Sequence, residues 1–168
     1  MSQALHALVL LGFSGLLFTA AYGDLRRFQI PNAISIALAL LYPFAAIANG
    51  AQAELAPHLI FALFTFLIGA GFFAAGLFGG GDVKLFAAVA FWVGPHEAGR
   101  LLVYTAGIGG ILALVLLTRQ GAALVGRVHA TSPAAEVVPD VAPMRRPVPY
   151  GVAIAIAGLA IQFSTVLL

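Results

Sequence analysis

The stretch Gly79-Gly80-Gly81-Asp82-Val83-Lys84 places three glycines and two opposite charges between two long apolar runs. Neither residues 59–78 before it nor residues 85–94 after it contain a charged side chain. A carboxylate at bilayer depth costs about 2.5–3.5 kcal/mol on insertion scales, so Asp82 should face protein or water rather than lipid. We therefore expect a functional site at this break, with a partner elsewhere in the chain.

The composition defines the broad class of the protein. The chain has 168 residues, of which 62% are hydrophobic and 8% are charged, whereas an average soluble domain carries about 25% charged residues. We expect an integral membrane protein whose surroundings are a lipid bilayer. The net charge of +2 is too small to indicate a nucleic-acid-binding surface, so no nucleic-acid partner is expected. The absence of cysteine excludes disulfides, thiol catalysis and a cysteine-bound zinc module.

Six apolar stretches are candidate membrane spans by their length or their lack of charge. We expect each to be a helix, because an isolated strand cannot satisfy its backbone hydrogen bonds in lipid. The sequence therefore predicts an all-α polytopic membrane protein with one membrane-embedded domain, residues 1–168. The expected spans are 4–22, 33–49, 57–78, 81–94, 100–118 and 150–168. By its length alone, the stretch 81–94 could instead be re-entrant. The polar, proline-containing segment 119–149 is expected to be a flexible cytoplasmic loop.

The distribution of basic residues predicts an orientation. Seven lysines and arginines fall in the first, third and fifth loops, whereas only Arg100 falls in the second and fourth. The positive-inside rule then places the odd-numbered loops in the cytoplasm and both termini outside. This alternation requires six crossings of the cell (inner, cytoplasmic) membrane, and it brings Asp24 and Asp82 to the same cytoplasmic boundary.

Acidic residues are scarce, and two of them adjoin predicted helices at the same membrane face. Of the six acids, Asp24 and Asp82 have this placement, and the other four lie in predicted loops. Two carboxylates held close together cannot both ionise easily, so one keeps a proton. The ionised carboxylate can activate water while the protonated one polarises a carbonyl, which is the chemistry of aspartic proteases.

Each of these acids also has a purely structural interpretation. Asp24 could form a surface ion pair with Arg26 or Arg27, and Asp82 could stabilise a helix N-terminus against the helix dipole. Both acids are expected on the same side of the membrane and at the same depth, and other acids are scarce. These observations favour the catalytic pair.

Several neighbouring residues are candidates for supporting roles. Gly79 and Gly81 would let a neighbouring or substrate backbone approach closely, although a simple turn is the plainer interpretation. Lys84 could reach the interface, influence Asp82 or contact substrate. Pro31 is suited to the start of the second span, and Asn32 could form a hydrogen bond near the site.

Other catalytic arrangements lack support in the sequence. The four histidines are scattered, and the pair His96-Glu97 lacks the second histidine of the zinc-protease helix motif. No Gly-x-Ser-x-Gly elbow is present. No metal and no cofactor are therefore expected.

At these residues the sequence resembles the type IV prepilin leader peptidases, which are membrane aspartic proteases of the GxGD type. The resemblance rests on Gly79-Gly80-Gly81-Asp82 followed by Val83-Lys84, and on Asp24 through Arg26-Arg27 to Ile30-Pro31-Asn32. A third match is Pro149-Tyr150-Gly151 at the start of the last span. The similarity extends over nearly the whole chain in the order of its spans.

The resemblance implies a GxGD-type protease bundle in which Asp24 and Asp82 are the catalytic aspartates. The implied reaction is cleavage of the short basic leader of a pilin-like precursor at the cytoplasmic face. The absence of cysteine and of a methyltransferase region makes the chain similar to the short Tad/Flp (CpaA-like) branch. Archaeal-type preflagellin peptidases share this layout and remain an alternative.

Two further classes of function remain open from the sequence. Asp24, Asp82 and Lys84 could form an ion or proton relay in a small transporter subunit. The chain could also be a non-catalytic scaffold in a secretion machine. The sequence does not indicate an oligomeric state.

Overall fold

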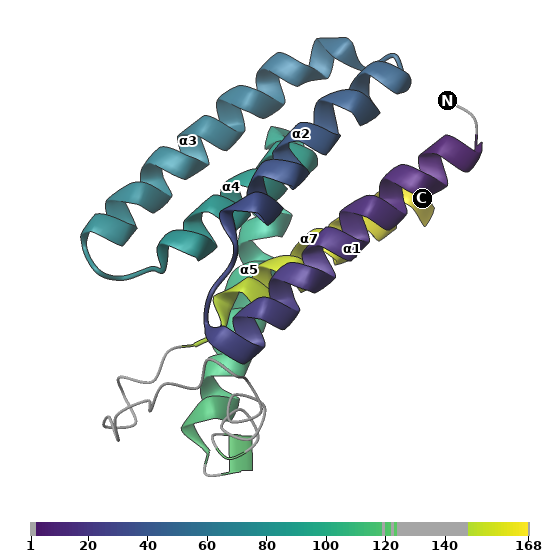
Figure 1. The fold of residues 1–168 in the computed structure, drawn as a ribbon. Helices are drawn as coiled ribbons and strands as arrows, with labels where there is room; N and C mark the ends of the chain where they lie inside the picture. Colours follow the sequence, from purple (N-terminus) through teal and green to yellow (C-terminus); the bar gives the residue numbers. More distant parts are fainter. Residues whose placement is uncertain (1–2, 119, 122, 124–147, 168) are drawn as a thin grey trace.

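The structure is a computed structural model that describes residues 3–118, 120, 121, 123 and 148–167. Six α-helices are bounded by described residues (Figure 1): α1 (Gln3–Arg27), α2 (Asn32–Ala48), α3 (Leu55–Ala74), α4 (Gly80–Val93), α5 (Ala98–Leu117) and α7 (Tyr150–Leu167). Two 3-10 turns, Gln52–Glu54 and Pro95–Glu97, connect α2 to α3 and α4 to α5. The all-helical prediction is confirmed, and most of the predicted loop 119–149 lies outside the described residues.

The predicted segments match the helices except at two ends. The stretch predicted as 4–22 continues as helix through Arg27, so Asp24 lies in the last helical turn of α1 rather than in the polar junction we expected. The stretch predicted as 57–78 is helical only to Ala74, and Gly76 then adopts a positive φ of 73°. The length of the apolar run predicted both ends wrongly. The helical hydrogen bonds of α1 continue into polar residues, whereas α3 ends at a glycine within its apolar run.

Three helices are long and apolar enough to cross a membrane by length and composition: Ala4–Arg27, Gln52–Ala74 and Pro95–Leu117. Asn32–Ala48 and Tyr150–Ser164 are shorter apolar helices. In α3 only Ala62 is buried, and large side chains such as Ile60 and Leu67 are exposed. Such a surface is suited to lipid rather than to water.

Helix α4 lies at the centre of the bundle although it has only 14 residues. It packs against α2, α3 and α7, and its side chains from Ala87 to Trp92 are all buried. Trp92 donates a hydrogen bond from Nε1 to the Leu38 carbonyl of α2 at 2.8 Å, and its ring lies 4.5 Å from that of Phe13 in α1. The buried indole thus has a partner for its N–H while it joins three helices.

Small residues allow the helices to approach closely, which is typical of membrane helices. A methyl group at position 69 of α3 would lie 2.7 Å from Val83 Cγ1 of α4, and one at position 109 of α5 would lie 2.8 Å from the Tyr150 ring of α7. Both distances are shorter than a van der Waals contact, so glycine is required at the present helix separations.

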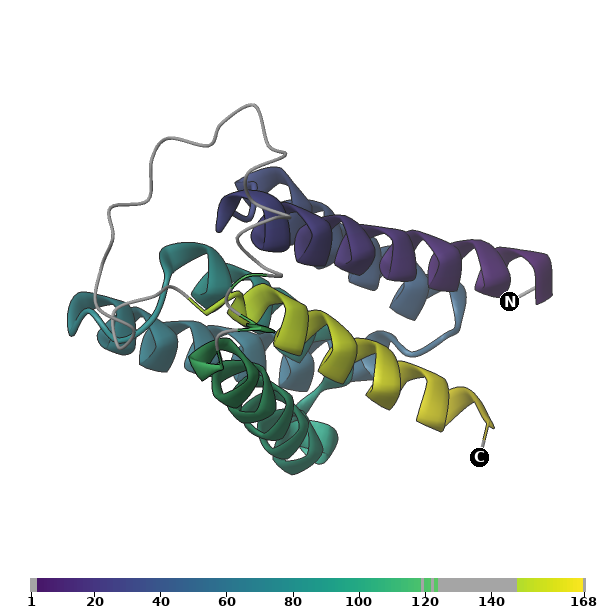
Figure 2. The ribbon, with the colours of Figure 1, turned by 90° about the horizontal axis from the view of Figure 1, so that it is seen from below.

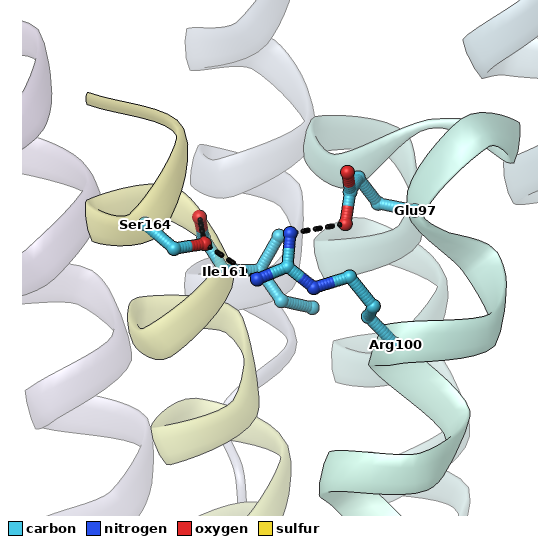
Figure 3. Close-up of polar contacts among 4 residues, drawn as sticks. All are labelled: Glu97, Arg100, Ile161 and Ser164. Carbon is cyan, nitrogen blue, oxygen red and sulfur yellow. Dashed lines mark hydrogen bonds and ion pairs between the residues drawn. The ribbon is translucent and has the colours of Figure 1, made fainter. Parts of the chain in front are cut away.

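Helix α7 lies between α1 and α5 and runs antiparallel to α1 (Figures 1 and 2). The described ends of α1 and α7 that are nearest the two termini therefore lie at one end of the molecule. At this end Arg100 of α5 donates hydrogen bonds to Glu97 at 2.9 Å and to Ser164 of α7 at 3.0 Å (Figure 3). The opposite end gathers the last turn of α1 and the first turns of α2, α4 and α7.

Candidate active site

Asp24 is buried at the end of α1 and is only 4% exposed. Its Oδ2 accepts a hydrogen bond from the backbone N–H of Gly151 at 2.7 Å. This amide belongs to the first turn of α7, where backbone N–H groups and the helix dipole favour a negative charge. The carboxylate is therefore held by a backbone group of a helix residue 127 positions away.

The surface ion pair that remained open for Asp24 is not observed in the part of the chain that the structure describes. Arg26 lies instead over the ring of Tyr22, with its Cζ 4.9 Å from the ring centre. The ion pair of the described residues joins Arg100 to Glu97 at the other end of the bundle. Among the described residues, Asp24 consequently has no ion-pair partner.

Asp82 lies in the first turn of α4, as the sequence predicts for a helix N-terminal charge. Its carboxylate interacts with the backbone of Gly79, the residue before the helix, so it contributes to capping α4. Its Oδ1, however, is buried and has no hydrogen-bond partner among the described residues. The structural role therefore occupies only part of the carboxylate and leaves one oxygen available.

One cavity of about 480 Å³ brings the two acids together. The residues lining it are Asp24, Phe28, Gln29, Ile30, Pro31, Asn32, Gly79, Gly80, Gly81 and Asp82. The two carboxylates are close enough to interact electrostatically, and both interact with the backbone of Gly151. Such a cavity has room for water and a peptide segment beside two acid groups, as acid–base hydrolysis requires.

The glycines of the 79–81 stretch are required by close contacts as well as by the turn. A methyl group at position 79 would lie 2.6 Å from Asp82 Oδ2, and one at position 81 would lie 3.2 Å from Ile30 Cβ. The methyl group at position 81 would also lie 3.5 Å from the Ile30 backbone nitrogen. A side chain at either position would displace Asp82 or separate α4 from the segment that follows α1.

The other predicted site residues are Pro31 and Asn32, which line the same cavity, and Lys84, which contacts Asn32. The Lys84 Nζ donates a hydrogen bond to Asn32 Oδ1 at 2.9 Å, and this bond joins α4 to the first residue of α2. Pro31 immediately precedes α2, as its position in the sequence predicts. Lys84 forms no ion pair with Asp82 in the described part of the chain, so it acts here as a tie between helices.

The structure also reveals contributions that the sequence did not assign. Gly151 was matched only as part of Pro149-Tyr150-Gly151, with no role, yet its amide contacts the Asp24 carboxylate. Phe28 adopts a positive φ of 48°, and this left-handed residue ends α1 and turns the chain toward the cavity. No local pattern identifies either role, because both depend on segments that meet only in the folded chain.

No group of three or more histidine, cysteine, aspartate or glutamate side chains arranged to hold a metal ion is found among the residues that the structure describes. The cavity itself offers two carboxylates and two amide side chains, those of Gln29 and Asn32, with otherwise apolar or backbone groups. Two neighbouring carboxylates are suited to general acid–base chemistry.

The fold and the cavity define a helical membrane protein with a paired-carboxylate pocket at one end of its bundle. The model of the type IV leader peptidase family matches residues 11–117, a segment that contains both Asp24 and Asp82. The chain belongs to the type IV leader peptidase family and is a leader-peptidase-like membrane protease. Neither a curated protein nor a solved structure matches it.

Proposed function

We propose that the protein is an aspartic endopeptidase in which Asp24 and Asp82 form the catalytic pair. The observation that carries this proposal is that both carboxylates line one cavity and interact with the same backbone group, that of Gly151. Within the described residues, the buried Asp82 Oδ1 has no hydrogen-bond partner, so its capacity to accept or share a proton is not used by the fold.

In the proposed reaction, the ionised carboxylate removes a proton from a water molecule between the two acids. The water oxygen forms a bond to the scissile carbonyl carbon while the protonated carboxylate donates its proton to the carbonyl oxygen. Collapse of the tetrahedral intermediate breaks the C–N bond, and the nitrogen of the leaving chain receives the proton that the first carboxylate took from water. The second carboxylate takes a proton back from a hydroxyl group of the intermediate, so both aspartates return to their starting states. Each aspartate thus acts once as an acid and once as a base, and the proposed reaction requires no metal.

The proposed substrate is the precursor of a type IV pilin of the Flp type, cleaved after its short basic leader. Family membership supports a leader peptide as the substrate class. The absence of cysteine, and hence of a cysteine-bound metal module, supports the short branch that cleaves without N-methylation. A preflagellin-type precursor is the alternative within the same chemistry.

The proposed topology has six crossings of the cell membrane, both termini outside and the catalytic cavity at the cytoplasmic face. The cavity is lined by the residues that connect α1 to α2 and α3 to α4, and α7 begins beside it. Arg26 and Arg27 lie in the last turn of α1 and Lys84 lies near the start of α4, beside these connections, which supports a cytoplasmic location. Helix α4 is about 21 Å long at 1.5 Å per residue, so neighbouring helices must bury it where it is shorter than the bilayer core.

Co-expression with candidate precursors tests the proposal. The wild-type protein, Asp24→Asn and Asp82→Asn are each expressed with an Flp-type prepilin and with a preflagellin, and mass spectrometry reads the new N-terminus. We expect wild-type cleavage of the prepilin after its leader and none in either variant. Cleavage of the preflagellin alone would assign the alternative branch, and full activity in either variant would refute the catalytic pair.

A further inference from the structure

The first turn of α7 lies directly against the candidate catalytic pair, although α7 is outside the segment matched by the family model. The N–H of Gly151 donates to Asp24 Oδ2 at 2.7 Å in a buried hydrogen bond, and the same backbone interacts with Asp82. A backbone donor cannot rotate away as a side chain can. Its direction is set by the placement of the helix that carries it.

Position 151 has no room for a side chain. A methyl group there would lie 2.8 Å from Asp24 Oδ2, 3.1 Å from Asp24 Cβ and 2.7 Å from Ile30 Cδ1. Two of these contacts are with the catalytic aspartate itself, so any larger residue must shift either that carboxylate or the start of α7. Glycine is therefore required by the approach of the two helices.

The start of α7 is fixed by contacts on several sides. Pro149 is fully buried, and the Tyr150 ring packs closely on Gly109 of α5. The same ring meets Phe78 at 5.6 Å in an edge-to-face contact, and Phe78 directly precedes the 79–82 segment that carries Asp82. Tyr150 thus couples the turn that presents the Gly151 amide to the turn that presents Asp82.

The far end of α7 is held as well. Arg100 donates to Ser164 Oγ, whose hydroxyl in turn donates to the Ile161 carbonyl at 2.8 Å (Figure 3). With both ends tied, α7 has little freedom to slide along α1. The Gly151 N–H is consequently preorganised for catalysis, because its orientation is set before substrate binds.

We propose that Gly151 is a positioning residue of the active site: its backbone N–H holds the Asp24 carboxylate in the orientation needed for catalysis, and α7 thereby completes a site whose acids come from α1 and α4. This inference rests on the proposed aspartic endopeptidase function. It assigns no chemistry to Gly151 itself, which acts through Asp24.

The test uses the full-length protein in detergent with a cleavable precursor, and it measures kcat, KM and thermal unfolding. Gly151→Ala is compared with Gly158→Ala, which is the same substitution in the same helix but crowds Val89 and Leu17 at 2.9 and 3.2 Å rather than Asp24. We expect Gly151→Ala to lower kcat about ten-fold or more, with KM changed less than two-fold. Gly158→Ala should reduce stability while kcat stays within two-fold of wild type.

A second variant separates displacement of Asp24 from simple crowding. Ile30→Val removes Cδ1, the atom nearest the new methyl group, but leaves the contacts with Asp24 unchanged. In Gly151→Ala/Ile30→Val we expect stability to return toward that of Ile30→Val alone while kcat stays at least about ten-fold lower than in that variant. Recovery of kcat to the level of Ile30→Val would overturn the proposal, because the defect would then be one of packing.

A backbone ester at position 151 removes the donor without adding an atom that crowds Asp24, and it decides the question if the alanine variants do not fold. Glycolic acid in place of glycine should lower kcat about ten-fold while binding of precursor is retained. Unchanged kcat in the ester variant would overturn the positioning role. The wild type distinguishes the two proposals: no cleavage of any precursor counts against the proposed function, whereas normal wild-type cleavage with fully active Gly151 variants counts only against this inference.

Discussion

Replacing Asp24 by asparagine should remove activity without weakening the fold. The asparagine Oδ1 can still accept the 2.7 Å hydrogen bond from the Gly151 N–H. Its amide nitrogen becomes a donor in the cavity that also holds the unpartnered Asp82 Oδ1. The substitution therefore keeps the shape and one hydrogen bond of the site while it removes a buried ionisable group that interacts with Asp82.

The expected effects of this substitution on activity and on stability have opposite directions and different sizes. Loss of a general acid or base lowers rates by about 10²–10⁴-fold. Providing a donor for a buried polar atom that lacks a partner is worth about 1–3 kcal/mol, so the free energy of unfolding of Asp24→Asn should equal or exceed that of the wild type. Such an increase is typical of active sites, where functional charges are held at a cost in stability.

Asp24→Ala is the matched control, because it removes both the charge and the acceptor. It leaves the Gly151 N–H without its partner and should lower the free energy of unfolding by about 1–3 kcal/mol while being equally inactive. The assay combines thermal unfolding in detergent with cleavage of the precursor for the wild type and both variants. The reasoning is refuted if Asp24→Asn keeps more than a tenth of wild-type activity, or if it destabilises the protein as much as Asp24→Ala does.

Three further predictions concern the packing around the site and its chemistry. Gly69→Ala should destabilise the protein by about 1–3 kcal/mol, because the new methyl group would meet Val83 at 2.7 Å, whereas Gly71→Ala, which meets nothing within 4 Å on the same helix, should be neutral or slightly stabilising in thermal unfolding. Equal effects of the two substitutions would contradict the close approach of α3 and α4. The Lys84–Asn32 hydrogen bond should appear as a coupling of about 0.5–1.5 kcal/mol in a double-mutant cycle of Lys84→Met and Asn32→Ala, and additive effects would show that it contributes nothing. Cleavage should continue at an unchanged rate in a chelator, because the proposed reaction uses only water and the two carboxylates of the cavity, and inhibition that added metal reverses would show a metal-dependent reaction.

Much of the helical architecture follows from local properties of the sequence. Membrane helices are set by run length and by the cost of burying charge, so the boundaries of α2 and α4 differ from the predicted ones by a single residue. Scarcity of acids was sufficient to select Asp24 and Asp82 as candidates. The predicted boundaries were wrong at the C-terminal ends of α1 and α3. At these two ends the helical hydrogen bonds do not stop where the apolar run stops.

The sequence alone established the class of chain, its helical segments and the stretch from Gly79 to Lys84 as an unusual break. Only the tertiary structure decided that Asp24 is buried and that the Gly151 amide donates to its carboxylate. It also decided that, within the part of the chain the structure describes, one buried oxygen of Asp82 has no hydrogen-bond partner. The physical reason is that helix formation and membrane insertion depend on neighbours within a few residues. The environment of a carboxylate depends instead on which helix ends meet in space, and here those ends come from positions as far apart as 24 and 151.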